Sequence, residues 1–274
     1  MRTLVLLSLV PVLWSAEDPS EIVRRAVKRD EKNWALARNY TFLERTEERD
    51  LDGSGQVRKR SSKTYDVTLL EGTPYRRLVE REDRPLKPSE VAEEQRKLEK
   101  SIENRKRESE EERRARLADW EKKRKEQREA ILEMPNAFDL TLLGTELLAG
   151  RRTYMIQAIP KPGYHSENRI ARFFPKVRGR MWIDAENYQW VRADAEVIDT
   201  ISIGWFLARI SQGTRFSFQQ VLVNNEVWLP SRLEILAAGR IVLLRKIHTE
   251  IEISYRNYRK FQTDSRILSA QPVQ

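Results

Sequence analysis

Residues 176–197 read KVRGRMWIDAENYQWVRADAEV and contain a pattern that recurs along most of the chain. Two runs of alternating side chains, 176–184 and 188–197, flank the short polar turn Ala185-Glu186-Asn187. In the first run Met181 and Ile183 point to one side, and Trp182 points to the other with its polar neighbours. A period of two predicts strands with one apolar and one solvated face, and the short turn predicts an antiparallel hairpin.

Further runs of the same kind lie on both sides of this hairpin, and most are joined by short polar turns. Paired runs of this kind predict an antiparallel meander, and hence a mainly β protein with added helices, an α+β fold. The other predicted strands are 39–50, 56–70, 72–81, 139–148, 152–160, 214–223, 228–237 and 240–258.

Two segments have a helical pattern instead. In residues 20–37, apolar side chains recur at helical spacing opposite Arg, Lys and Glu, which predicts a helix packed on the sheet; a lid or a membrane-surface helix is the alternative. Residues 87–134 are almost wholly charged residues, Ala and Gln, with a few apolar positions. They predict a charged helical insertion that bends near Ser109 into two helices. The insertion is expected either to be solvated along its length or to dock a partner, and Trp120 is expected to contact the rest of the domain.

The N-terminus has the order of a secretory signal. A basic start, the apolar run 4–13 and a small-residue end at Ala16 predict a signal peptide over 1–16, and a single domain over 17–274. The run also fits an uncleaved anchor or a buried apolar strand. Export predicts a periplasmic or secreted protein. The chain has no cysteine, which excludes disulfides and thiolate metal sites, and only two histidines.

The charge of the chain bears on its partners. The net charge is +9, and 34% of the residues are charged against about 25% in a typical domain. The basic runs 58–60 and 122–125 could suggest nucleic-acid binding, but acidic residues surround the second run. We therefore expect no nucleic acid and at most peripheral contact with a membrane.

Residues 50–57, DLDGSGQV, look like the start of a calcium loop. Counted from Asp50, loop position 12 is Ser61 where a calcium loop needs a carboxylate, and position 9 is Arg58. The flanking residues look extended, so the stretch predicts a tight turn between two strands in which glycine adopts positive φ.

No constellation of residues predicts catalysis. Phosphate loops, GxSxG elbows and HExxH helices are absent from the sequence, and His165, Ser166 and Glu167 are neighbours in a predicted loop. We expect no catalytic residue, no metal, no cofactor and no enzyme activity. A curved sheet covered by helices can enclose an apolar cavity, and aromatic residues of the second half are candidates for its wall, or else core residues. They are Trp182, Trp190, Trp205, Phe206, Phe216 and Phe218.

The assembled pattern resembles the exported outer-membrane lipoprotein-sorting proteins, the LolA-like lipid carriers. Three stretches prompt the comparison: GRMWID at 179–184, NNEVWLP at 224–230 and YRNY at 255–258. The resemblance covers roughly 20–81 and 137–261, and the insertion at 87–134 departs from it. It implies an incomplete β-barrel with helices over its open side and an apolar cavity for acyl chains.

The function expected from these observations is that of a non-enzymatic carrier or binder of lipid or lipidated protein. The alternative is a cell-envelope interaction scaffold that docks a protein partner through residues 87–134. A hydrolase is a distant third.

Overall fold

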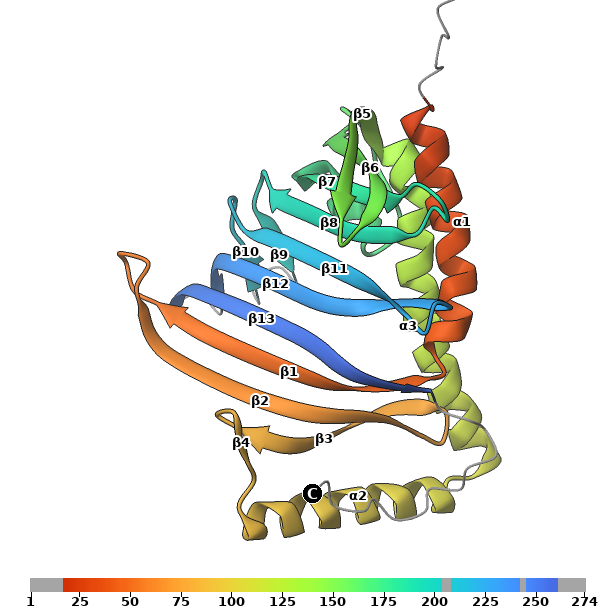
Figure 1. Cartoon of the computed structure of the whole chain (residues 1–274). Helices are drawn as coiled ribbons and strands as arrows, with labels where there is room; N and C mark the ends of the chain where they lie inside the picture. Colours follow the sequence, from red (N-terminus) through yellow and green to blue (C-terminus); the bar gives the residue numbers. More distant parts are fainter. Residues whose placement is uncertain (1–16, 204–207, 242–244, 261–274) are drawn as a thin grey trace, which may run out of the picture.

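The computed structural model describes residues 17–203, 208–241 and 245–260, and its core architecture is one curved antiparallel sheet (Figure 1). The hydrogen-bonded order is β4-β3-β2-β1-β13-β12-β11-β8-β7-β6-β5, and the short β9 and β10 branch from β12. Within these residues β4 and β5 do not pair, so the sheet is unclosed, as an incomplete barrel requires. The strands are β1 Tyr40–Leu51, β2 Val57–Leu70, β3 Thr73–Arg81, β4 Arg84–Pro85, β5 Phe138–Leu148, β6 Arg151–Pro160, β7 Val177–Asp184, β8 Trp190–Val197, β9 Ile201–Ile203, β10 Ala208–Ile210, β11 Arg215–Val223, β12 Val227–Ile241 and β13 Arg245–Lys260.

The predicted meander is confirmed, with one long-range closure that local patterns did not reveal. Consecutive strands pair within β1–β3, β5–β8 and β11–β13. The last strand, β13, then lies against the first, β1, with Thr46 opposite Ile253. One predicted boundary is wrong: the run 240–258 is divided, since β12 extends to Ile241. The sequence also missed β4, β9, β10 and the 3-10 helix η1, Ala171–Lys176.

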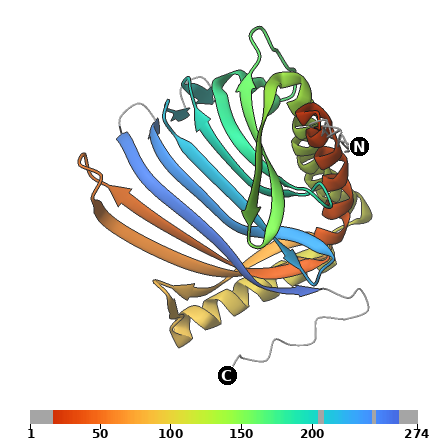
Figure 2. The same ribbon diagram turned by 45° about the horizontal axis from the view of Figure 1, so that its top comes forward.

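Helix α1, Pro19–Ala37, confirms the predicted first helix and packs on one face of the sheet. The Asp18 side chain caps it by accepting from the Ser20 backbone N–H at 3.0 Å. Its buried stripe of Ile22, Val23, Ala26 and Val27 forms the main core with side chains of β5 to β8. We call the face of the sheet that α1 covers the helix side, and the other face the hollow side (Figures 1 and 2). The strand partners in this core include Phe138, Ile156, Ala158, Met181, Ile183 and Trp190.

The charged insertion forms two helices, α2 Pro88–Arg107 and α3 Glu110–Ala137, so the predicted break near Ser109 is confirmed. Ser109 caps α3 in a reciprocal arrangement with Glu112. At the corner, the Glu108 carboxylate pairs with Arg116 and Arg105, each at 2.7 Å, and these guanidinium groups lower the pKa of Glu108 to about 2.

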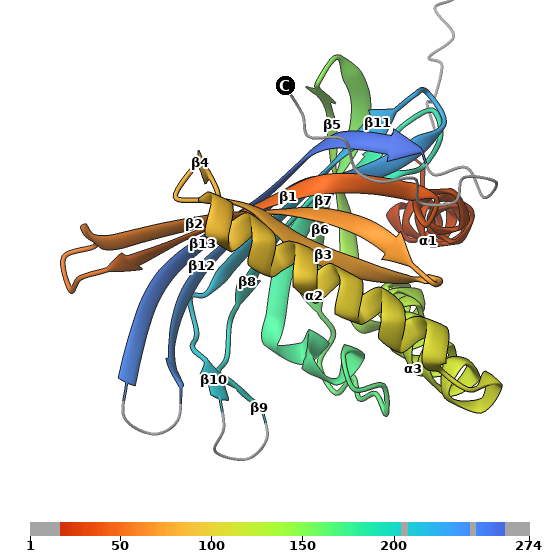
Figure 3. The same ribbon diagram turned by 90° about the horizontal axis from the view of Figure 1, so that it is seen from below.

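The expectation of a solvated insertion holds for α2 and is wrong for much of α3. No side chain of α2 is buried, and the helix lies along the β3 edge (Figures 1 and 3). Helix α3 instead packs beside α1 and buries Ala130 and Ala137. Trp120 is the expected contact with the body: its ring lies 6.1 Å from that of Trp34 on α1.

Residues 52–55 form the predicted turn, between β1 and β2. The Asp52 carboxylate accepts hydrogen bonds from the Ser54 N–H, the Ser54 hydroxyl and the Gln56 N–H at 2.7–3.0 Å, and Gly55 has φ +84°. Both flanks are strands, unlike the helices of a calcium helix–loop–helix site. The predicted signal peptide, 1–16, lies outside the described residues. Among the residues that are described, no helix is long and apolar enough to span a membrane.

Candidate functional site

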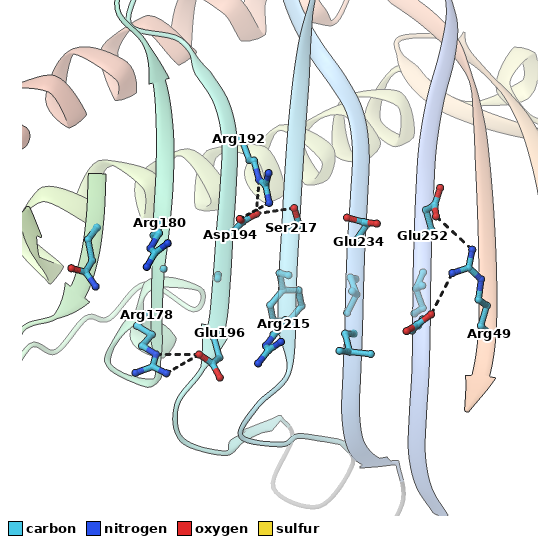
Figure 4. Close-up of a pocket in the computed structure, with 18 of the residues that line it drawn as sticks. Arg49, Arg178, Arg180, Arg192, Asp194, Glu196, Arg215, Ser217, Glu234 and Glu252 are labelled. Atoms are coloured by element: carbon cyan, nitrogen blue, oxygen red, sulfur yellow. Dashed lines mark hydrogen bonds and ion pairs between the residues drawn. The ribbon is translucent and has the colours of Figure 1, made fainter. Parts of the chain in front are cut away.

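The hollow side of the sheet carries a broad hollow of about 1020 Å³ that runs across β6, β7, β8, β11, β12, β13 and β1 (Figure 4). Its walls are mainly charged side chains, because the residues that alternate with the apolar ones in these strands point this way. The charged lining residues are Glu47, Arg49, Arg178, Arg180, Arg192, Asp194, Glu196, Arg215, Glu234, Glu250 and Glu252.

Ion pairs satisfy most of these charges. Arg178 pairs with Glu196 at 2.9 Å and lowers the pKa of that carboxyl. Arg192 pairs with Asp194 at 2.7 Å, and Asp194 also accepts from a serine hydroxyl. Arg180, drawn in Figure 4, is joined to none of the carboxylates drawn with it.

Glu47, on β1, is the most deeply buried carboxylate of the hollow, at 3% exposure. It accepts from Arg60 at 2.7 Å, from Arg49 at 2.6 Å and from Arg45. The Arg60 hydrogen bond, with those of the other two guanidinium groups, lowers the pKa of Glu47 to about 2 despite its burial. Arg49 extends the network to Glu250 at 3.3 Å. At this end of the hollow, guanidinium groups of the protein itself therefore neutralise the buried carboxylate.

The helix side of β8, β11, β12 and β13 is apolar. Cross-strand pairing aligns two rows of side chains from β8 to β13, which we call the apolar rows. All eight are half-buried, and within the described residues none belongs to or packs against a core cluster. The rows are Ala193, Phe218, Leu233 and Ile253, and beside them Ala195, Phe216, Ile235 and Ile251. The four residues of the second row also border the hollow.

The apolar rows continue the face that α1 covers. Met181 pairs with Ala193, and it packs in the main core beneath α1. Gly179 pairs with Ala195, and a Cβ at Gly179 would come within 2.4 Å of the Asp194 carbonyl oxygen. Small residues therefore occupy this part of β7 and β8, beside the bulkier apolar side chains of β11 to β13.

The structure does not gather the six predicted cavity residues into one place. Phe216 and Phe218 lie in the apolar rows. Trp190 is 9% exposed and packs in the main core on the same side, while Trp182 lies on the hollow side, where its indole N–H donates to Glu146 at 2.8 Å. Trp205 and Phe206 lie outside the described residues.

Sequence reasoning missed Leu233 and Ile235 as members of this surface, although their alternation in the predicted strand 228–237 was a usable signal. His165, Ser166 and Glu167 lie in a loop after β6, as predicted. In the described ranges no group of three or more His, Asp or Glu side chains could hold a metal ion.

No family model matches the sequence. No curated protein sequence matches it either. Several solved structures resemble it across most of its length. A DUF1329 family protein from Desulfovibrio piger is 11% identical, with a TM-score of 0.34, and the match covers 91% of this chain and 95% of that one.

Two further structures carry the names that the sequence resemblance predicted. A putative outer membrane lipoprotein-sorting protein domain from Vibrio parahaemolyticus is 9% identical, with a TM-score of 0.37, covering 89% of this chain and 95% of its own. A LolA superfamily protein from Nitrosomonas europaea is 8% identical, with a TM-score of 0.30, covering 90% and 94%. Identities and TM-scores this low carry no argument about function.

Proposed function

We propose that the protein is an exported, non-enzymatic carrier that binds the acyl chain of a lipid or lipidated protein along the apolar rows. The observation that carries the proposal is the set of eight aligned, half-buried apolar side chains that pack against no described core cluster. Apolar surface left next to a finished core is a common mark of a binding surface.

The size of the apolar rows fits one acyl chain. The rows cross four neighbouring strands, β8, β11, β12 and β13, and three strand spacings of ~4.8 Å give a length of ~14 Å. One acyl chain in a bilayer occupies half of the ~30 Å hydrocarbon thickness, ~15 Å. Each methylene buried contributes about 0.8 kcal/mol, which must exceed the entropic cost of binding.

Uptake of acyl chains can be measured directly. The purified protein is examined by mass spectrometry for bound lipid, then delipidated and titrated with a fluorescent fatty acid. We expect saturable uptake by the wild type. Absence of both bound lipid and saturable uptake would overturn the proposal.

Two leucines of β12 offer a matched pair of variants. Leu233 lies in the apolar row that is not part of the hollow, and Leu236, on the opposite face of the strand, lines the hollow. Leu233→Glu places a charge in the apolar rows and should weaken uptake tenfold or more, while Leu236→Glu should leave it unchanged. Equal effects of the two variants, with both proteins folded by circular dichroism, would argue against the apolar rows as the binding surface.

A second candidate function is protein docking through α2, which buries no side chain and exposes Val91 to 52%. Deletion of the whole insertion is a poor test, because α3 packs against α1. Val91→Glu is better, with Val57→Glu as a control of equal exposure on β2. Loss of a defined envelope partner in Val91→Glu alone, with acyl uptake retained, would favour this second function.

A further inference from the structure

The outer face of α1 presents a stripe of basic side chains, which we call the α1 basic face: Arg25, Lys28, Arg29 and Lys32. Arg25, Lys28 and Lys32 are aligned at intervals of three and four residues, so they lie along one line of the helix, with Arg29 beside them. All four are exposed, and the buried stripe of α1 lies on the opposite side. Helix α1 lies at the outer edge of the molecule (Figures 1 and 3).

Three of these cations have no partner within the described residues. Arg25 bonds to Glu21 at 3.2 Å and to the Tyr188 hydroxyl at 2.9 Å. Lys28, Arg29 and Lys32 form no ion pair with any residue of the described ranges. Two of the three exposed lysines of α3 differ: Lys123 pairs with Asp119 at 2.8 Å and Lys125 with Glu129 at 3.7 Å, each within one helical turn.

The groups opposite the basic face do not neutralise it. The β7–β8 turn forms the other wall of a hollow of about 240 Å³ against α1, and it supplies Glu186, Asn187 and Tyr188. The Glu186 carboxylate pairs at 2.9 Å with Arg151, which lies outside this hollow. The flanking acid Glu31 is three residues after Lys28 and so lies near it on the helix surface, but the two form no ion pair, and one carboxylate does not balance the four cations of the basic face. The basic face therefore holds a local excess of positive charge.

We propose that the α1 basic face docks the protein onto a membrane surface that carries anionic lipids. Charge complementarity supports this occupant: unpaired, exposed cations on a helix attract an anionic surface, and the attraction decays within a Debye length. The apolar stripe of α1 is already used in the core, so the helix does not insert, and docking is electrostatic and reversible. The inference does not depend on acyl binding.

Vesicle sedimentation tests the docking. The probes are vesicles of pure phosphatidylcholine and vesicles of phosphatidylcholine mixed with phosphatidylglycerol. We expect the wild type to bind only the anionic vesicles, and to be released between about 0.1 M and about 1 M salt, as the Debye length falls from ~10 Å to ~3 Å. Failure to bind anionic vesicles at low salt would overturn the proposal.

A matched pair of triple variants separates a local site from overall charge. Lys28→Glu, Arg29→Glu and Lys32→Glu together should weaken vesicle binding about 100-fold, since each basic residue near an anionic membrane contributes about fivefold. The same reversal at Lys122, Lys123 and Lys125 on α3 changes the net charge equally and should leave binding within about threefold. Equal losses in the two triple variants would refute docking through α1.

Two further measurements, of binding to a small anion and of fatty-acid uptake, complete the test. Calorimetry with inorganic pyrophosphate should show no stoichiometric binding; tight binding lost in the α1 triple variant would mean a phosphate site and would overturn membrane docking. Fatty-acid uptake should be unchanged in that variant, so failure of docking and failure of acyl binding are distinguished.

Discussion

Glu47→Gln removes the central carboxylate of the network on β1, and its effect on stability should depend on pH. The carboxylate is 3% exposed, and hydrogen bonds from Arg60, Arg45 and Arg49 lower the pKa of Glu47 from 4.5 to about 2. At about 1.4 kcal/mol per pKa unit, the network stabilises the fold by about 3 kcal/mol. Arg60 is half-exposed, so solvent screening reduces this to about 2 kcal/mol.

The pH dependence follows from the direction of this pKa shift. Because the folded pKa lies below the unfolded one, the stabilisation is complete above about pH 5 and is lost as the pH falls towards 2. Urea unfolding should therefore show Glu47→Gln less stable by about 2 kcal/mol at pH 7, and by less than half of that at about pH 3. Glu48→Gln, an exposed neighbour on the other face of β1, is the control and should change little. A loss of stability that stays constant from pH 7 to pH 3 would mean that the Glu47 carboxylate is not stabilised by these guanidinium groups.

Three other results are expected. Gly179→Ala should destabilise the fold by about 1–3 kcal/mol in urea unfolding, because its Cβ would lie 2.4 Å from the Asp194 carbonyl oxygen. The control Gly53→Ala, whose Cβ meets no atom within 4 Å, should leave the stability unchanged. Equal losses of stability in the two variants would contradict this account. Hydrogen exchange should be fastest in α2 and slowest in β13 and β1. Trp120→Ala should accelerate exchange in α3 but not in the sheet. Uniform protection across helices and sheet would mean that α2 is packed along its length. Calcium titration should show no micromolar binding at the β1–β2 turn, because the Asp52 carboxylate already accepts three hydrogen bonds of the turn. Asp52→Ala removes these hydrogen bonds, so it should lower the melting temperature equally with and without calcium.

The two faces of the sheet assign different kinds of chemistry to the same strands. On the hollow side, ion pairs such as Arg178–Glu196 are made within the protein and leave little uncompensated charge. On the helix side, the apolar rows lie outside the core clusters of the described residues, and this is why the acyl site is proposed there. The hollow of about 1020 Å³ on the other side has mainly charged walls, which disfavour an acyl chain.

Local patterns in the sequence specify the secondary-structure elements and the character of each strand face. Alternation along 176–184 sets Met181 and Ile183 on one face and Trp182 on the other, because a strand has a period of two wherever it lies. The turn at Asp52 and the helix break at Ser109 were equally readable, since a side-chain hydrogen bond within four residues forms each of them.

Which faces and strands meet depends instead on long-range contacts in the folded chain. The pairing of β13 with β1 joins the two ends of the domain, and no local pattern specifies a contact over such a separation. A register shift between β7 and β8 places Trp190 opposite Ile183, in the core. Trp182 stays on the other face of the sheet, so the two tryptophans lie on opposite sides of it. Helix α3 likewise gains its place from Trp120, whose ring lies near that of Trp34, and from Ile131 and Met134, which pack against the main core. These partners are present only once the chain has folded, because burial depends on the whole set of neighbours.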